Sequence, residues 1–230
     1  MFRIYDMKII ADQLNIITLS FVLAVIMTRS AMSQPETIKL PGPATKGSFA
    51  LEEAIYQRRS ERNFLNKKLT LEQISQILWA AQGITGEING VKVRTAPSAG
   101  ALYPMEVYLL TDDGLYLYQP QDHSLKTLNN KDLRESLAVA AFGQQWVAEA
   151  PISLVLSAVH ERITRKYGPR GERYSLIEAG HIAQNVHLQA VALGLGSVPI
   201  GAFSEEKVSD VLGLPENQEP LYLIPVGYPR

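Results

Sequence analysis

The sequence predicts an α+β domain in which helices wrap a central sheet that contains antiparallel strands. An Asp-Asp-Gly turn at residues 112–114 separates two apolar segments, residues 106–110 and 115–118, which is the pattern of a β-hairpin. Residues 152–159 form an almost unbroken apolar run, typical of a central strand covered on both faces. Helical periodicity precedes and follows these strands without strict alternation, which favours the α+β class.

The N-terminal part differs from the rest of the chain. Residues 16–27 carry no charge but are too few to span a bilayer comfortably. Lys8 precedes them, and small residues at 31–33 offer a cleavage site, so residues 1–33 are predicted to be a signal peptide that exports the protein to a periplasmic or other extracytoplasmic space. Acidic residues in the leader leave alternatives: an uncleaved membrane anchor facing the cytoplasm, or a buried N-terminal helix.

Residues 34–47 contain three prolines and two glycines, which predicts an extended linker or arm before a folded domain at residues 48–230. Ser48 is expected to cap a helix over residues 51–57. Thr70 and Gln73 form a capping box for a second helix that ends at Gly83. The following segment, up to Leu102, is predicted to be a long loop.

Further helices are expected over residues 131–142 and 174–193. The latter is apolar on all sides, which indicates burial at the centre of the domain or in an interface. A short strand or extended segment, a short helix and a last strand complete the domain, at residues 197–203, 205–212 and 221–226.

Bulk composition excludes several function classes. The net charge of −1 gives no indication of a nucleic-acid partner. The absence of cysteine removes disulfides, thiolate metal sites and cysteine nucleophiles. His181 and His187 stand six apart and so face different sides of a helix, which argues against a metal site and favours core or interface histidines.

Arg58, Arg59, Ser60 and Arg62 place three guanidinium groups and a hydroxyl within five residues at the end of the first helix. Guanidinium forks match phosphate oxygens and keep their charge at any accessible pH, so a phosphate site is predicted here. Compensation of the helix dipole explains one or two of the arginines, and a solvated structural cluster is the alternative.

Two further segments are candidates for chemistry. Residues 194–201 (GLGSVPIG) combine a helix exit with glycines that allow close backbone approach to a flat ligand, or form a plain tight connection. Lys166 and Tyr167 stand among the arginines at 162, 165, 170 and 173, which is typical of an exposed loop pair; a lysine can serve as a base only if burial lowers its pKa.

Five motifs occur in one order: RRSER (58–62), PSAGALYP (97–104), EAGHIAQNVHLQAVALGLG (178–196), SVPIGAF (197–203) and PVGYPR (225–230). With them, the chain resembles the nitroreductase superfamily of flavin mononucleotide (FMN) enzymes over residues 48–230. PSAGALYP together with KYGPRGERY (166–174) is most similar to the azoline dehydrogenase-like branch, the SagB/ThcOx type. The resemblance implies a nitroreductase-like fold and an intertwined homodimer.

The resemblance also implies roles for individual residues. The ribityl phosphate would be held by Arg58, Arg59, Ser60, Arg62 and Arg230. Across the dimer interface, the isoalloxazine and ribityl chain would contact a loop that consists of Pro97, Ser98, Ala99 and Gly100. The reactive edge of the ring would pack on Val198, Pro199, Ile200 and Gly201. The substrate proton would be removed by Lys166 and Tyr167.

The resulting expectation is an FMN-dependent oxidoreductase that performs ping-pong hydride transfer on a small-molecule or peptide-derived substrate. NAD(P)H is the expected donor for a reductase, and oxygen the acceptor for a dehydrogenase. Alternatives are a flavin-binding carrier or partner subunit without turnover, an azoline-type peptide dehydrogenase in a partner complex, and the flavin-fragmenting or dehalogenating branches. Export argues against peptide-cyclising assembly, and a membrane contact is expected only if the N-terminal segment is uncleaved.

Overall fold

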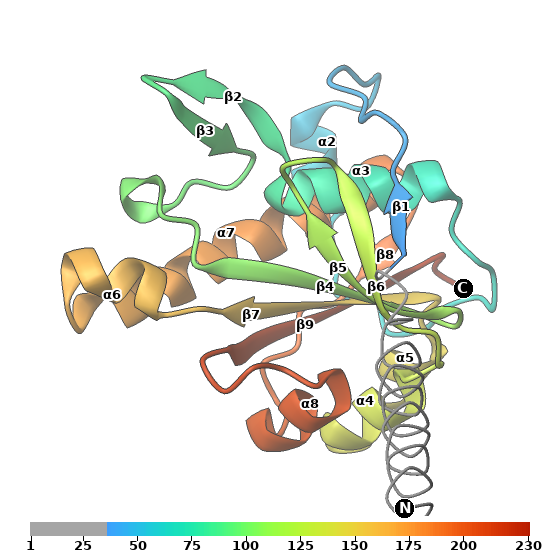
Figure 1. The fold of residues 1–230 in the computed structure, drawn as a ribbon. Coiled ribbons are helices and arrows are strands. Elements are labelled where there is room, and N and C mark those ends of the chain that lie inside the picture. The colour runs from blue at the N-terminus through green and yellow to red at the C-terminus, as the bar shows by residue number, and fades with distance from the viewer. Residues whose placement is uncertain (1–35) are drawn as a thin grey trace, which may run out of the picture. The chain divides into compact units, whose positions relative to one another are not determined.

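A seven-stranded sheet is the centre of the domain in the computed structural model, which describes residues 36–230 (Figure 1). The strand order is β1-β6-β5-β4-β7-β9-β8, and every neighbouring pair is antiparallel. The strands are β1 (Thr37–Lys39), β4 (Met105–Thr111), β5 (Gly114–Gln119), β6 (Ser124–Asn129), β7 (Ile152–Ala158), β8 (Gly196–Ser197) and β9 (Glu219–Gly227). The predicted α+β class with an antiparallel sheet is confirmed.

Helices cover both faces of this sheet. One face carries α3 (Leu71–Gln82) and α7 (Arg170–Ala192), and α2 (Leu51–Gln57) packs on α7. The other face carries α4 (Arg134–Ala140), α5 (Gln145–Glu149) and α8 (Glu205–Leu212). α6 (Glu161–Tyr167) stands at the end of β7 and leads into α7 (Figure 1).

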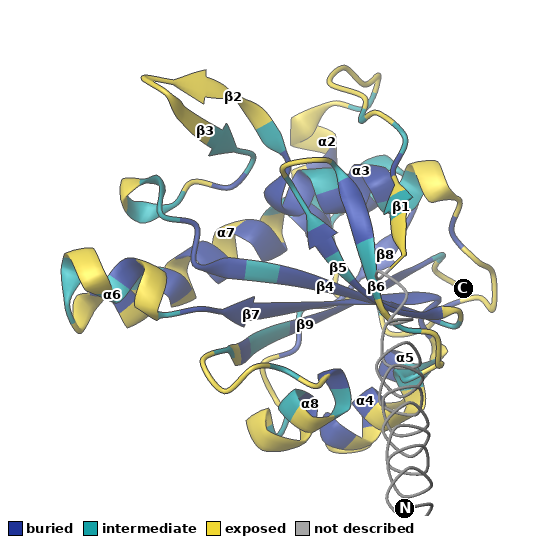
Figure 2. Ribbon diagram, viewed as in Figure 1, coloured by how far each residue is buried: buried dark blue, intermediate teal, exposed yellow. Residues whose placement is uncertain are grey.

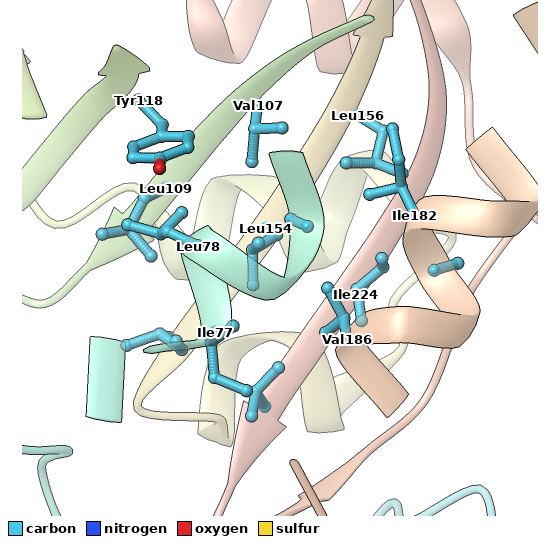
Figure 3. Close-up of a cluster of buried hydrophobic side chains, with 14 of the residues drawn as sticks. Ile77, Leu78, Val107, Leu109, Tyr118, Leu154, Leu156, Ile182, Val186 and Ile224 are labelled. Carbon is cyan, nitrogen blue, oxygen red and sulfur yellow. The ribbon is translucent and has the colours of Figure 1, made fainter. Parts of the chain in front are cut away.

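β7 shows why two helical layers form. All seven of its residues are buried, and successive side chains point to opposite faces of the sheet. Leu154 and Leu156 pack towards Ile182 and the rest of the α3–α7 layer (Figure 3). Val155 faces the opposite cluster with α4 and α8. The unbroken apolar run of this strand therefore reflects burial on both sides, and the outer faces of the helices stay exposed (Figure 2).

Local signals account for several boundaries. The capping box at Thr70 and Gln73 is present, and the hairpin closes at Thr111 opposite Gly114. The expected cap at Ser48 is wrong: α2 begins after Ala50, whose side chain cannot accept a hydrogen bond. The arm predicted before Ser48 contributes β1, which pairs with β6.

The predicted long loop after Gly83 is wrong in its first part. Residues Ile84–Ile88 (β2) and Val91–Arg94 (β3) form a separate two-stranded hairpin. Its turn is Asn89-Gly90, and both residues have positive φ angles, of 52° and 78°. Asn-Gly is a strong signal for such a two-residue hairpin, and it decided the local structure here because both residues tolerate the left-handed backbone.

Strand β6 and helices α5 and α6 also have no counterpart among the sequence-based predictions. Lys166 and Tyr167 consequently lie at the end of a helix and not in an open loop. No helix in the range 36–230 is both long enough and apolar enough to cross a membrane. The predicted signal peptide or anchor, residues 1–33, lies outside the described residues.

Candidate functional site

The arginine segment meets two distant parts of the chain at one end of the sheet. Ser60 pairs with Ser197 in a parallel bridge, and the amide of Glu61 donates to the carbonyl of Ser197 at 3.0 Å. The amide of Arg230 donates to the carbonyl of Asn63 at 3.1 Å. The structure thus brings the arginine segment, the strand β8 and the C-terminus side by side through backbone hydrogen bonds.

Gly196 permits this close approach. A Cβ atom at residue 196 would stand 2.6 Å from both Cβ and Cγ of Glu61, a distance that real contacts do not reach. The side chain of residue 196 must therefore be absent for residues 60–61 to pair with β8. The glycine has a packing role, since no positive φ is required at this position.

The arginines at this end have no acidic partners within residues 36–230. None of the ion pairs there includes Arg58, Arg62 or Arg230. Arg62 lies 5.7 Å from the ring centre of Trp146, within cation–π range. Arg59 differs, because its Nη1 donates to the carbonyls of Tyr56 and Arg58 at 2.8 and 2.7 Å. Uncompensated guanidinium groups at one end of the sheet suit an anionic ligand.

His187 on α7 lies behind this cluster. It is buried, and its Nδ1 is 2.8 Å from the hydroxyl of Ser197. Burial, with the positive charge of Arg58, lowers the pKa of His187 to about 4. The ring is therefore neutral near pH 7, so the arginines remain the cationic groups of this end. The expectation of a core or interface histidine agrees with this burial.

The segment expected at the ring of a flat ligand runs along β9. Ile200 exchanges two backbone hydrogen bonds with Leu223, at 2.8 and 3.0 Å. The side chains of Val198 and Ile200 are buried, whereas Pro199 is half-buried and Gly201 is exposed. Backbone at Gly201 is accordingly accessible from the surface.

The loop between α4 and α5 makes contacts with the site that the sequence-based predictions did not include. Gln144 donates its side-chain amide to the carbonyls of Ala202 and Ala141, each at 2.8 Å. Together with the contact of Arg62 and Trp146, this places residues 142–146 against both the arginine segment and the segment that ends at Gly201. Gly143 was the available sequence signal for a tight loop, and its φ is positive in the structure.

The second group of predicted site residues lies elsewhere. Gly100 has a φ of 64°, and a Cβ atom there would stand 2.8 Å from Tyr167 Oη and 3.0 Å from Lys166 Nζ. The loop of Pro97, Ser98, Ala99 and Gly100 therefore packs directly against the Lys166–Tyr167 pair. Lys166 itself is exposed, and Tyr167 is half-buried with its ring edge-on to Tyr174 at 5.2 Å.

The two groups occupy opposite ends of β7. Ala158, at its end, pairs with Met105 next to the loop, and Ile152, at its start, pairs with Val226 next to the arginine end. Seven strand residues span about 20 Å. Figure 1 shows α6 and the C-terminus at opposite ends of the sheet. Within one chain, the structure does not bring these two groups together.

Among the hollows of the described chain are two that lie apart from both groups and one that lies beside the loop of residues 97–99. Two of them, of about 300 and 610 Å³, are lined by Phe49, Trp79, Gln189 and neighbouring residues of the arm, α3 and α7. A hollow of about 290 Å³ lies between the loop of residues 97–99 and α7, and it is lined in part by Glu178. Among residues 36–230, no group of three or more histidine and carboxylate side chains could hold a metal ion.

Glu178 is a second site residue that the sequence analysis missed. It is buried, and burial raises the pKa of its carboxyl to about 7. The signal was present, since Glu178 is the sole carboxylate in the apolar stretch from Ser175 to Leu193.

Fold and site define an α+β protein with a cationic end suited to a phosphate-bearing ligand. The chain belongs to the nitroreductase family, whose model matches residues 55–228. A provisionally named nitroreductase of Methanocaldococcus jannaschii is 45% identical over 183 residues, which cover 77% of this chain and 90% of that protein. The crystal structure of a provisionally named nitroreductase from Ralstonia eutropha superposes with a TM-score of 0.77 at 32% identity, covering 86% of this chain and 91% of the other.

Relatives with named activities are more distant. The NADPH:FMN oxidoreductase of Vibrio harveyi, solved with NAD+, has a TM-score of 0.58 at 26% identity and covers 78% of this chain and 68% of that one. The FMN reductase [NAD(P)H] of Bacillus subtilis is 23% identical over 76% of this chain and 64% of its own length. The microcin-processing protein McbC of Escherichia coli is 29% identical over 66% of this chain and 60% of its own length.

Proposed function

We propose that this protein is an FMN-dependent oxidoreductase that uses NAD(P)H as electron donor when it reduces its substrate. The observation that carries the proposal is that Arg58, Arg62 and Arg230 lie at one end of the sheet, beside the Ser60–Ser197 pairing, with no acidic partner among the described residues. Family membership and the FMN reductases among its relatives support the same cofactor. FMN supplies hydride transfer when bound, so the protein's tasks are to bind, orient and shield it.

The residues of the arginine end fit the flavin phosphate. Arg58 and Arg62 offer guanidinium forks to its oxygens, and Ser60 offers a hydroxyl. Arg59 contributes charge but is engaged with backbone carbonyls. The backbone from Val198 and Pro199 to Ile200 and Gly201 provides a flat surface for the ring, fixed along β9.

A homodimer completes the site in this proposal. One chain holds its two groups of site residues at opposite ends of β7, so a second copy is needed to place a loop of residues 97–100 beside a flavin held at the arginine end. α2 and α7 pack on each other and expose large apolar side chains that a second copy would cover. These are Leu51, Ile55, Tyr56, Leu176 and Ile177, each at least 47% exposed.

Within this site, Lys166 and Tyr167 would move the substrate proton while the flavin accepts or gives the hydride in alternate half-reactions. Their contact with Gly100 supports that role, because it places both polar groups at the loop assigned to the flavin. The same pair and the likeness to McbC favour the azoline dehydrogenase-like branch and a peptide-derived substrate. The second candidate is a flavin carrier or partner subunit, favoured by the exposure of Lys166 in one chain.

Export remains part of the proposal through the predicted signal peptide, with an uncleaved anchor as its alternative. Both rest on residues 1–33 alone. N-terminal sequencing of the mature protein distinguishes cleavage before Gln34 from an intact N-terminus.

The first test is the visible spectrum of the purified protein and the chromatographic identity of any flavin it releases. We expect one FMN per chain in the native protein. Arg58→Ala combined with Arg62→Ala should weaken FMN binding by about 100-fold or more, because two charge-assisted contacts are lost. A matched control removes two exposed charges elsewhere, Lys131→Ala with Lys207→Ala, and should keep full occupancy.

Full flavin occupancy in the double arginine variant would refute the phosphate assignment. A native protein that neither contains nor takes up FMN would overturn the proposed cofactor. Steady oxidation of NAD(P)H with a quinone or nitroaromatic by this chain alone separates the enzyme from the carrier.

A further inference from the structure

One carboxyl oxygen of Glu178 lacks a hydrogen-bond donor in the interior of the domain. The residue is 1% exposed, and its Oε1 accepts a hydrogen bond from Gln82 Nε2 at 3.0 Å. Its Oε2 is buried and makes no hydrogen bond of normal geometry among the described residues. A buried carboxylate oxygen without a donor is costly, so its environment needs an explanation.

Polar contacts link Glu178 to the loop through a nearly closed ring. Gln82 accepts from Arg94 Nη1 at 3.2 Å, and the amide of Arg94 donates to Tyr103 Oη at 3.1 Å. The amide of Tyr103 donates to Ser98 Oγ at 2.9 Å. Ser98 and Glu178 line the same hollow, and the Ser98 hydroxyl lowers the pKa of that carboxyl.

The backbone enclosed by these contacts is strained. Gly100, Ala101 and Tyr103 all have positive φ angles, of 64°, 54° and 48°. Side-chain-bearing residues rarely adopt this conformation, and the surrounding contacts must hold them there. The polar ring that contains Glu178 therefore fixes the orientation of Ser98 as well as the path of the loop.

The hollow of about 290 Å³ beside Glu178 gives the carboxyl access to protons. It lies between residues 97–99 of the loop and the side chains of Tyr174, Glu178 and His181 on α7. Its volume is sufficient for several water molecules at about 30 Å³ each. Glu178 can thus exchange a proton with solvent although it is buried.

The charges that face Glu178 are few. Arg94 approaches from β3 and, with Gln82 and Ser98, lowers the pKa of the carboxyl, but burial outweighs them. Tyr174 and His181 face the same hollow from the carboxyl's own helix. With its pKa near 7, the carboxyl exists in both forms around neutral pH.

A hydroxyl group has one proton and two lone pairs, and one lone pair of Ser98 is used by the amide of Tyr103. When Glu178 is a carboxylate, the proton of Ser98 is directed to it, and Ser98 offers only a lone pair to a ligand. When Glu178 is a carboxylic acid, it donates to Ser98, and the Ser98 proton is free for an acceptor on the ligand.

We propose that Glu178 is a positioning residue whose protonation state decides whether Ser98 donates or accepts a hydrogen bond at the flavin ring. The inference rests on the proposed function, in which the loop of residues 97–100 meets the flavin. The acidic form matches a ring carbonyl oxygen, and the ionised form matches a ring N–H group. If FMN binds more tightly below the pH at which Glu178 titrates, the partner of Ser98 is a ring carbonyl oxygen.

The test is the dissociation constant of FMN, measured by fluorescence between pH 5.5 and 8.5 for the native protein, Glu178→Gln, Ser98→Ala and the control Glu172→Gln, an exposed carboxylate on the same helix. One hydrogen bond changes affinity by about threefold to tenfold, so we expect a step of that size near pH 7 in the native protein and the control. The FMN phosphate titrates near pH 6 in every variant, so differences between variants carry the result.

Glu178→Gln should lack the step and bind FMN at all pH values as the native protein does at low pH, because an amide always donates to Ser98. Ser98→Ala should lack the step with weaker binding throughout. Retention of the native step in either variant would overturn the proposal, and so would a native protein that shows no step.

A direct titration keeps the inference separate from the proposed function. Carbon-13-labelled glutamate in the flavin-free protein should show one carboxyl with a midpoint near pH 7 that is missing in Glu178→Gln. Its absence refutes the inference whether or not FMN binds, whereas failure of the native protein to bind FMN refutes the proposed function. If Glu178→Gln does not fold, Ser98→Ala and this titration in the native protein still decide the matter.

Discussion

The two ends of the sheet, the arginine end and the end beside the loop of residues 97–100 (the loop end), each hold one buried residue of α7, and burial shifts the pKa values of these two residues in opposite directions. His187 and Glu178 stand nine residues apart, which is about 13 Å along the helix axis. Burial lowers the pKa of His187 to about 4 and raises that of Glu178 to about 7, because in each case the charged form loses its hydration. The arginine end therefore keeps a constant positive charge around neutral pH, whereas the loop end can gain or lose one charge.

The two ends are also built differently. Backbone pairing assembles the arginine end, through Ser60 with Ser197 and Asn63 with Arg230. Side-chain contacts and left-handed residues assemble the loop end, through Ser98 with Tyr103 and Gln82 with Glu178. The arginine end depends on the close approach of backbone segments and therefore tolerates many side-chain changes. The loop end depends on particular polar side chains. This contrast teaches that cofactor retention and proton chemistry can fail independently.

The largest effect should separate chemistry from cofactor retention. Lys166→Ala removes a polar group at the loop end and should lower turnover by about 100-fold or more, as expected for loss of a proton-transfer group. FMN occupancy should stay at the native level because the arginine end is untouched. Turnover and bound flavin are measured on the same preparation, with the exposed Lys207→Ala as control. Loss of flavin from Lys166→Ala would show that the two ends are one unit.

The next effect concerns stability at acid pH. The pKa of His187 in the folded protein lies below its unfolded value of 6.5, so unfolding takes up a proton as the pH falls. The contribution of His187 to stability should therefore be lost as the pH falls from about 6.5 to 4, by up to about 3 kcal/mol. Glu178 has the opposite sign: its raised pKa makes stability fall as the pH rises from about 4.5 to 7.

Denaturant unfolding at a series of pH values checks this opposition. His187→Gln should remove the loss on the acid side, and Arg58→Ala should reduce it because the repelling charge is gone. Glu178→Gln should remove the decline towards pH 7 and make the loss of stability on the acid side larger, because between about pH 4.5 and 6.5 the native carboxyl offsets the effect of His187. An identical pH profile for His187→Gln and the native protein would contradict the assignment.

The smallest effect tests the backbone assembly of the arginine end. Gly196→Ala forces its Cβ against Glu61, and this overpacking should cost about 1–3 kcal/mol of unfolding free energy and weaken FMN binding. Gly86→Ala in β2 is the matched control, since a Cβ there also meets nothing within 4 Å and the residue lies outside the proposed flavin site. Thermal unfolding and FMN titration compare the two. Equal stability of both variants would mean that the pairing of residues 60–61 with β8 is loose.

Local sequence signals predicted much of the fold but only part of the site. The capping box at Thr70 and the turn before Gly114 were readable because their hydrogen bonds close within a few residues. The arginine cluster was readable because its residues are adjacent. Gln144 escaped prediction, because its partner Ala202 is far along the chain and nothing local marks the contact. Glu178 was visible as a lone carboxylate, but its burial was not.

Residue types specify the chemical groups of the chain: the guanidinium cluster at residues 58–62, the Lys166–Tyr167 pair and the apolar strand that becomes β7. Tertiary structure alone decided that Ser60 lies beside Ser197, that the Lys166–Tyr167 pair packs on Gly100, and that one carboxyl on α7 is buried next to a hollow. The reason is physical. Residue type fixes charge and hydrogen-bonding capacity, whereas proximity and desolvation, which set pKa values and binding geometry, arise only when distant segments pack together.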